Sequence, residues 1–201
     1  MRSAKAVLLW LALAAAVAVP IAVASASPLL QWRQPIYVAA GFAGVIAMAL
    51  LLVQPVLAGG YLPGLPVRRG RRVHRVTGAV LVGAVIVHVA GLWATSPPDV
   101  VDALTFTSPT PFSNWGVIAM WAVFSAAFLA VLRPRLRPRA WRIGHSIAVA
   151  VVVVASVVHA MLIEGTMGVV SKALLGALAL AATAKVLADL RVWRLLPRHR
   201  A

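Results

Sequence analysis

Six long apolar runs, separated by charged or turn-forming residues, dominate the hydrophobic pattern of the chain. A membrane-spanning helix needs about 20 consecutive apolar residues, and the runs are roughly that long. The pattern therefore predicts an all-α integral membrane protein, a bundle of six transmembrane helices. We expect residues 1–201 to form a single transmembrane domain, with spans at about 6–26, 36–58, 73–95, 114–132, 141–163 and 167–190.

The basic residues follow these runs in a one-sided way. Five arginines lie in VRRGRRVHR, before the third run, and five more in RPRLRPRAWR, after the fourth. The loop at 96–113 contains no Lys or Arg, and only a short turn of helix is expected there, at 99–104. Because cytoplasmic loops carry an excess of Lys and Arg, the arginine-rich loops are expected inside. Both termini, including the basic tail at 191–201, are then cytoplasmic in a multi-pass protein of the cell inner or plasma membrane.

Composition supports the membrane assignment and narrows the chemistry. The chain is 62% hydrophobic and 11% charged, which is outside the range of an ordinary soluble domain. The net charge of +15 comes mainly from arginines in the loops between the apolar runs. Such loops are attracted to anionic membrane lipid, so no nucleic-acid partner is expected. The absence of cysteine excludes disulfides and covalently attached c-type haem.

The first run also has features of a secretory signal. Basic residues precede it, and Ala24, Ser25 and Ala26 mimic a cleavage site. A run of about 21 residues exceeds the usual apolar core of a signal and favours a retained span.

Two of the predicted spans carry histidines at the same spacing. His74 and His88 lie in the third span, and His145 and His159 lie in the fifth. Fourteen residues come within about 40° of four helical turns, so each pair shares one helix face, with about 21 Å between its members. Odd-numbered spans run parallel, so facing helices would bring His74 opposite His145 and His88 opposite His159.

This arrangement predicts iron bound between histidine pairs. A structural zinc ion needs four ligands at one point, whereas the spacing offers two at each depth. Two imidazoles on opposite faces of one iron are the axial ligands of a low-spin b-type haem, so His74, His88, His145 and His159 predict two haem b groups. Such ligation leaves no open axial position and favours electron transfer. The alternative for His74 and His145 is that they are interfacial residues that reach water.

The arginine cluster before His74, the two histidine spacings and the topology resemble the ferric reductase-like transmembrane domain. That family is the haem-binding core of NADPH oxidases and ferric reductases, and the resemblance covers roughly residues 36–190. It implies an inner haem on His74 and His145, an outer haem on His88 and His159, and electron flow from a cytoplasmic flavin to an acceptor outside.

One feature of that family is missing from the sequence. No glycine-rich dinucleotide fingerprint is present, so no soluble dehydrogenase domain is expected, and FAD or FMN would be supplied in trans by a cytoplasmic flavin reductase.

Further residues have predicted roles beside the histidines. Arg75 and Arg142, next to the inner pair, are expected to bind haem propionates, and the remaining arginines to dock an acidic flavoprotein. Arg33 and Lys172 are the outer cations available for the second haem. Trp141 is expected in an aromatic belt at the membrane surface.

Three other functions remain open from the sequence. One is a quinone-linked cytochrome b subunit, and another is the haem subunit of a periplasmic methionine sulfoxide reductase system. The third is a proton- or metal-coupled transporter, in which intramembrane histidines relay ions. The sequence leaves the electron donor, the acceptor and the direction of flow open.

Overall fold

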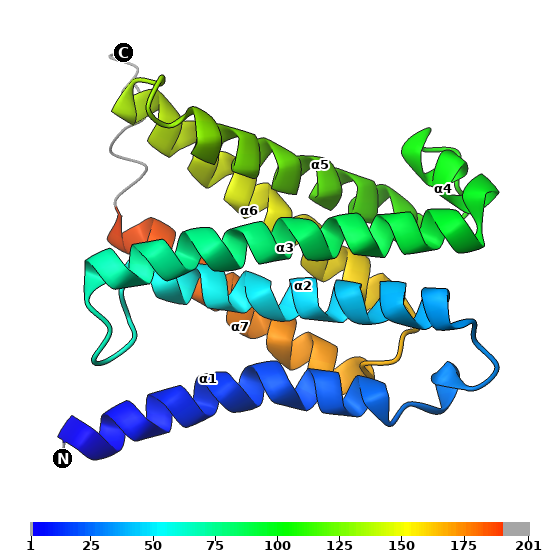
Figure 1. Cartoon of the computed structure of the whole chain (residues 1–201), viewed down its shortest axis with the longest axis horizontal. Helices are drawn as coiled ribbons and strands as arrows, with labels where there is room; N and C mark the ends of the chain where they lie inside the picture. The colour runs from blue at the N-terminus through cyan, green and yellow to red at the C-terminus, as the bar shows by residue number, and fades with distance from the viewer. Residues whose placement is uncertain (1, 191–201) are drawn as a thin grey trace, which may run out of the picture.

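The structure, a computed structural model, describes residues 2–190, and every regular element in that range is a helix (Figure 1). The elements are α1 (Arg2–Ser25), η1 (Pro28–Leu30), α2 (Pro35–Gly59), α3 (Val67–Thr95), α4 (Pro97–Leu104), α5 (Pro111–Leu132), α6 (Pro138–Leu162) and α7 (Val169–Asp189). Six of them, all except η1 and α4, are long and apolar enough to cross a membrane. The predicted all-α multi-pass membrane protein is thereby confirmed. The basic tail at 191–201 lies outside the described residues.

Local sequence explains where several helices begin. α2, α4, α5 and α6 each start at a proline, whose fixed φ suits the first helical turn and whose missing N–H is not needed there. α3 begins at Val67, before the predicted span at 73–95, because arginines are good helix formers and extend the helix beyond its apolar part. α4 includes the short turn expected at 99–104.

The bundle is built from two antiparallel hairpins and two covering helices. α2 packs against α3, and α5 packs against α6, while α1 and α7 lie along the other side of α2 (Figure 1). The close approach of α2 and α3 requires Gly91, because a Cβ there would lie 2.7 Å from Cβ of Ala40. Met48, Val153 and Leu175 are among the buried core residues. α3 and α6 run in the same direction and belong to different hairpins.

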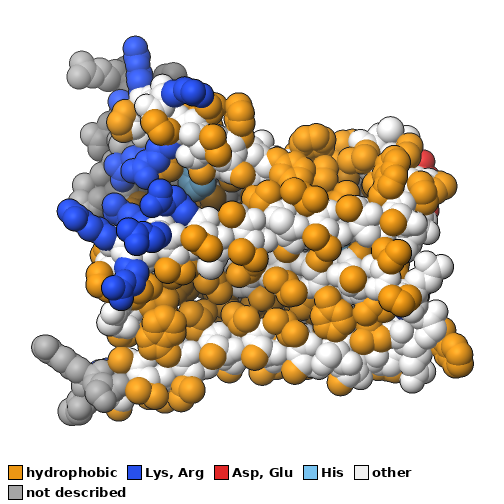
Figure 2. Space-filling view, viewed as in Figure 1, with side chains coloured by type: hydrophobic (Ala, Val, Ile, Leu, Met, Phe, Trp, Pro, Cys, Tyr) orange, Lys and Arg blue, Asp and Glu red, His pale blue; other side chains and the backbone are white. Residues whose placement is uncertain are grey.

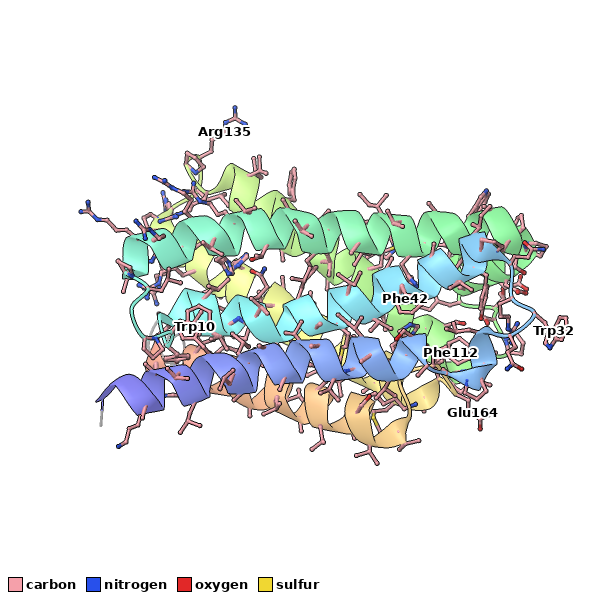
Figure 3. The ribbon with its side chains drawn as sticks, turned by 60° about the horizontal axis from the view of Figure 1, so that its bottom comes forward. Trp10, Trp32, Phe42, Phe112, Arg135 and Glu164 are labelled. Atoms are coloured by element: carbon pink, nitrogen blue, oxygen red, sulfur yellow. The ribbon has the colours of Figure 1, made fainter. Side chains whose placement is uncertain are left out.

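Charge is concentrated at one end of the bundle, which we call the arginine-rich end (Figure 2). It comprises Arg68, Arg69, Arg71, Arg72, Arg75, Arg133, Arg135, Arg137, Arg139 and Arg142. Figure 3 shows Arg135 at this end, with Trp32 and Glu164 at the opposite end. Large apolar side chains such as Leu8, Val80 and Phe128 are exposed, as expected of a surface that faces lipid.

Two hydrogen bonds join α1, the α2–α3 loop and α7 at the arginine-rich end. Trp10 Nε1 donates to the carbonyl of Pro63 at 3.2 Å, and Tyr61 Oη donates to Oδ2 of Asp189 at 2.6 Å. Lys185 forms an ion pair with the same carboxylate at 2.8 Å. Partial burial and the hydrogen bond to Asp189 raise the pKa of Tyr61 to about 12.

Candidate functional site

The histidines of α3 and α6 meet in pairs across the two hairpins. The ring centroids of His88 and His159 lie 6.5 Å apart, with an angle of 80° between the ring planes. His74 and His145 lie within range of electrostatic interaction with each other. The structure therefore brings together the residues that the parallel-helix argument pairs, and all four side chains are partly buried.

The Nδ1 atom of each histidine forms a hydrogen bond with a backbone carbonyl of the other helix in its hairpin. On α3, His74 bonds to Gln54 O at 3.2 Å and His88 to Ala40 O at 2.7 Å. The equivalent bonds on α6 are His145 to Ala126 O at 3.2 Å and His159 to Phe112 O at 2.8 Å. A carbonyl oxygen can only accept, so an Nδ1 that hydrogen-bonds to it carries the proton, and Nε2 of the same ring keeps a free lone pair. For His74 this holds in one of the two orientations of the Gln54 side chain.

The acceptors repeat the spacing of the histidines. Ala40 and Gln54 are fourteen residues apart on α2, and Phe112 and Ala126 are fourteen apart on α5. Two antiparallel hairpins thus present two imidazoles each in the same register. The common spacing of the histidines and their acceptors follows from the antiparallel pairing of the helices in each hairpin, and not from a sequence motif that the two hairpins share.

Glycines form matching seats for His88 and His159. Gly44 follows Ala40 by four residues, and a Cβ there would lie 3.0 Å from Nδ1 of His88. Gly116 stands in the equivalent place on α5, where a Cβ would lie 2.7 Å from Cε1 of His159. Real Cβ atoms do not come as close as the contact at Gly116, so the ring of His159 occupies space that only glycine leaves free. The contact at Gly44 is tight, and a Cβ there would require a small shift of His88.

His74 has a second neighbour in the side-chain amide of Gln54, which lies 2.7 Å from Nδ1. With Oε1 toward the ring, the amide accepts the Nδ1 proton, and its Nε2 donates to Thr77 Oγ1 at 2.9 Å. With Nε2 toward the ring, the amide instead donates to Nδ1, and its oxygen accepts from Thr77 Oγ1 and Gly78 N, both at 2.9 Å. Only the first orientation leaves Nε2 of His74 bare, so binding of a metal would select it.

The centroid separation of His88 and His159 is close to that of two imidazoles bound to one metal ion. A metal–imidazole bond is about 2 Å long, and the ring centroid lies about 1 Å behind the bonding nitrogen, so two opposed rings have centroids about 6 Å apart. The separation of 6.5 Å is close to that value. Across residues 2–190, no three His, Asp or Glu side chains gather as a metal-binding group, so the histidines stand as pairs.

Trp141, predicted to lie in an aromatic belt, also contacts His145 and Arg133. Its indole stacks on His145, with centroids 5.5 Å apart and ring planes within 15°, and the Arg133 guanidinium lies 4.8 Å from the indole centroid. Trp141 Nε1 is buried without a hydrogen-bond partner. Arg75 and Arg142, predicted to bind propionates, are exposed at the same end of the bundle. Sequence reasoning missed the Arg133–Trp141–His145 stack because it placed Trp141 by hydropathy alone.

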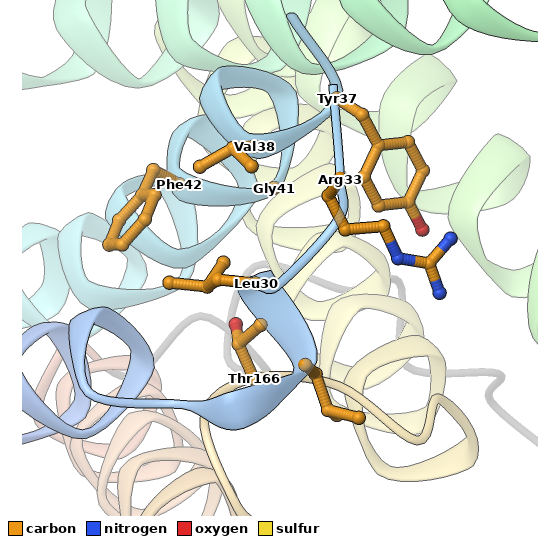
Figure 4. A pocket seen from close by; sticks show the side chains of 8 residues that line it. Leu30, Arg33, Tyr37, Val38, Gly41, Phe42 and Thr166 are labelled. Carbon is orange, nitrogen blue, oxygen red and sulfur yellow. The ribbon is translucent and has the colours of Figure 1, made fainter. Parts of the chain in front are cut away.

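Two surface pockets lie apart from the histidines. The larger, which we call the arginine pocket, has a volume of about 290 Å³ and is lined by Pro66, Arg68, Arg69 and Arg72. The smaller, of about 40 Å³, lies at the opposite end (Figure 4), where Arg33 lies over the ring of Tyr37 at 5.1 Å.

Comparison with known families gives one match. The family model described as ferric reductase like transmembrane component matches residues 40–156, which is more than half of the chain. The matched range includes His74, His88 and His145, and His159 lies three residues beyond it. No curated protein and no solved structure matches the chain.

Proposed function

The chain belongs to the family of ferric reductase like transmembrane components, and from that premise we propose that it is a membrane cytochrome with two haem b groups, each held by two histidines. The family resemblance seen in the sequence is confirmed, and it indicates a transmembrane component of electron transfer. The pairs His74–His145 and His88–His159 are the proposed iron ligands.

The hydrogen bonds of the four rings carry this proposal. With Oε1 of Gln54 toward His74, each Nδ1–H donates to a carbonyl oxygen, and each Nε2 lone pair is left for iron. A hydrogen bond from the second ring nitrogen is the usual device that fixes the tautomer and orientation of a metal-bound histidine. Haem b, when bound, supplies reversible one-electron chemistry at its iron. α3 and α6 supply the ligands, and the carbonyls of α2 and α5 set the direction of the rings in advance.

The two sites are proposed to conduct electrons along the bundle. Fourteen helical residues separate their levels by about 21 Å, which places one pair near each side of an apolar layer of about 30 Å. Two histidine ligands on one haem iron would leave no position open for oxygen, so the chain's residues would favour electron transfer over oxygen binding. The direction we propose is from the arginine-rich end to the opposite end.

The arginine-rich end is proposed to face the cytoplasm and to receive electrons there. Excess Lys and Arg favour the cytoplasmic side of the cell inner or plasma membrane. The arginine pocket has no carboxylate in its lining, so it suits an acidic surface of a flavin reductase that carries FAD or FMN. Anionic lipid headgroups are attracted to the same surface.

Propionates of the haem at the His74–His145 site require cations or N–H donors. Arg75 and Arg142 remain the proposed partners, because each is next to or near a ligand of this pair in sequence. The unpaired Nε1–H of Trp141, stacked on His145, is a further donor. This donor is buried, so it has more to gain from a charged acceptor than an exposed arginine has.

A visible absorption spectrum with haem extraction tests the proposal. We expect low-spin spectra and two non-covalent haem b groups per fully loaded chain. One haem per chain would favour the haem subunit of a methionine sulfoxide reductase system. Absence of haem would overturn the proposal and favour a proton- or metal-coupled transporter. Reduction by quinol alone would favour a quinone-linked cytochrome b subunit.

A further inference from the structure

Lys172 is the buried charged residue of the part of the chain that the structure describes. It lies in the first turn of α7 and is 5% exposed. Its Nζ donates to the carbonyl of Met161 at 3.4 Å and to the carbonyl of Ile163. These contacts direct the ammonium group to the end of α6, whereas the sequence alone suggested Lys172 as a cation for a haem propionate.

The bonded carbonyls belong to the turn that follows His159. The last carbonyls of a helix lack intrahelical partners, and a basic side chain there both satisfies them and complements the helix dipole. Met161 is two residues beyond His159 and Ile163 is four beyond, so the contacts lie about 3 to 6 Å further along the axis. A positive charge is therefore fixed within about one helical turn of a proposed iron ligand.

We propose that Lys172 raises the reduction potential of the haem held by His88 and His159, an inference that rests on the proposed function. A fixed positive charge stabilises an added electron by Coulomb attraction, and local charge is one of the factors that set haem potentials. Lys172 thereby lowers the free energy of an electron at this site relative to the His74–His145 site. Transfer away from the arginine-rich end is favoured as a result.

Burial distinguishes Lys172 from the other charges of the bundle. Arg33, Asp99, Asp102 and Glu164, which lie at the same end, are exposed. Water and salt screen exposed charges over about 8 Å at physiological ionic strength, whereas a buried charge is screened much less. Removal of the Lys172 charge should therefore change the nearer potential more than removal of an exposed charge would.

The test is a redox titration of the haem-loaded protein followed by its absorption spectrum. Lys172→Gln removes the charge but keeps an N–H donor for the α6 carbonyls, Lys172→Arg keeps both, and Lys172→Met removes both. Lys185→Gln is the matched control, because Lys185 lies on the same helix but is exposed and paired with Asp189. The signal of the His88–His159 haem is identified as the one that His159→Ala removes.

We expect the midpoint potential of that haem to fall in Lys172→Gln and Lys172→Met, and to stay near the parent value in Lys172→Arg. A tenfold change in the electron distribution between the sites corresponds to about 59 mV for a one-electron couple, and we expect a shift of about that size. The potential of the other haem should stay unchanged in all variants, as should both potentials in Lys185→Gln.

Two results would overturn the inference. One is an unchanged potential in Lys172→Gln at normal haem content. The other is a fall in Lys172→Met alone, which would mean that Lys172 acts through hydrogen bonds and not through charge. If Lys172→Met loses haem, the comparison of the potentials in Lys172→Gln and Lys172→Arg decides whether the charge sets the potential. A parent protein without haem would contradict the proposed function, whereas a parent with two haems and unshifted variants contradicts only the role of Lys172.

Discussion

Gly116→Ala should selectively impair haem binding at the His88–His159 pair. A Cβ at this position would lie 2.7 Å from Cε1 and 2.8 Å from Nδ1 of His159. Carbon atoms in good contact are about 3.5 to 4.0 Å apart, so the ring would have to retreat by about 1 Å. The ring cannot retreat freely, because its Nδ1 is bound to Phe112 O at 2.8 Å. Overpacking of this kind costs about 1 to 3 kcal/mol.

If that cost falls on the ligand geometry, affinity for haem at this pair falls about 5- to 150-fold. The assay is haem titration of the haem-free protein, with the two sites resolved by spectrum. Gly83→Ala is the control, because no atom lies within 4 Å of its added Cβ. Gly44→Ala, with a contact of 3.0 Å to His88, should show a smaller effect. Unchanged affinity and spectrum in Gly116→Ala would refute the idea that the glycine seat sets the position of His159.

Three further predictions concern the arginine-rich end. Trp141→Ala should weaken haem retention at the His74–His145 site more than Trp141→Phe, which keeps an aromatic ring on His145; equal haem content in both variants and the parent would contradict this. Tyr61 has a pKa raised to about 12, above the value of about 10 in an unfolded chain. The raised value means that the protonated form is the one stabilised by folding, so the stability advantage of the parent over Tyr61→Phe should be complete below pH 10 and decline between pH 10 and 12. Thermal unfolding across that range measures it, and a pH-independent difference would refute it. Gln substitutions in the arginine pocket should slow reduction by an acidic flavoprotein at low salt and leave haem content unchanged; a rate that is insensitive to both salt and substitution would exclude this docking surface.

The sequence was sufficient to predict the six long helices, because each span is long, apolar and bounded by proline, glycine or arginine. It also supplied the histidine pairs, since a spacing of fourteen residues fixes one face of a helix whatever surrounds it. Whether these histidines bind iron stays a prediction. The start of α3 differed from the predicted span because hydropathy marks the apolar part of a helix and not its hydrogen-bonded length.

Features that depend on two helices at once could not be predicted. The carbonyls of Ala40 and Phe112 carry no side-chain signal, and their role follows only from the antiparallel register of each hairpin. Gly116 resembles any other small residue of a membrane helix until His159 is placed against it. The buried contacts of Lys172 likewise require the fold of the turn between α6 and α7.

Substitution of the four histidines, one at a time, tests whether they bind two haems in the proposed pairs. The haem content and redox titration of each Ala variant show which histidines serve the same haem. We expect His74→Ala and His145→Ala to lose or alter one haem, and His88→Ala and His159→Ala to lose or alter the other. Grouping of His74 with His159, or an effect confined to His88 and His159, would contradict this expectation.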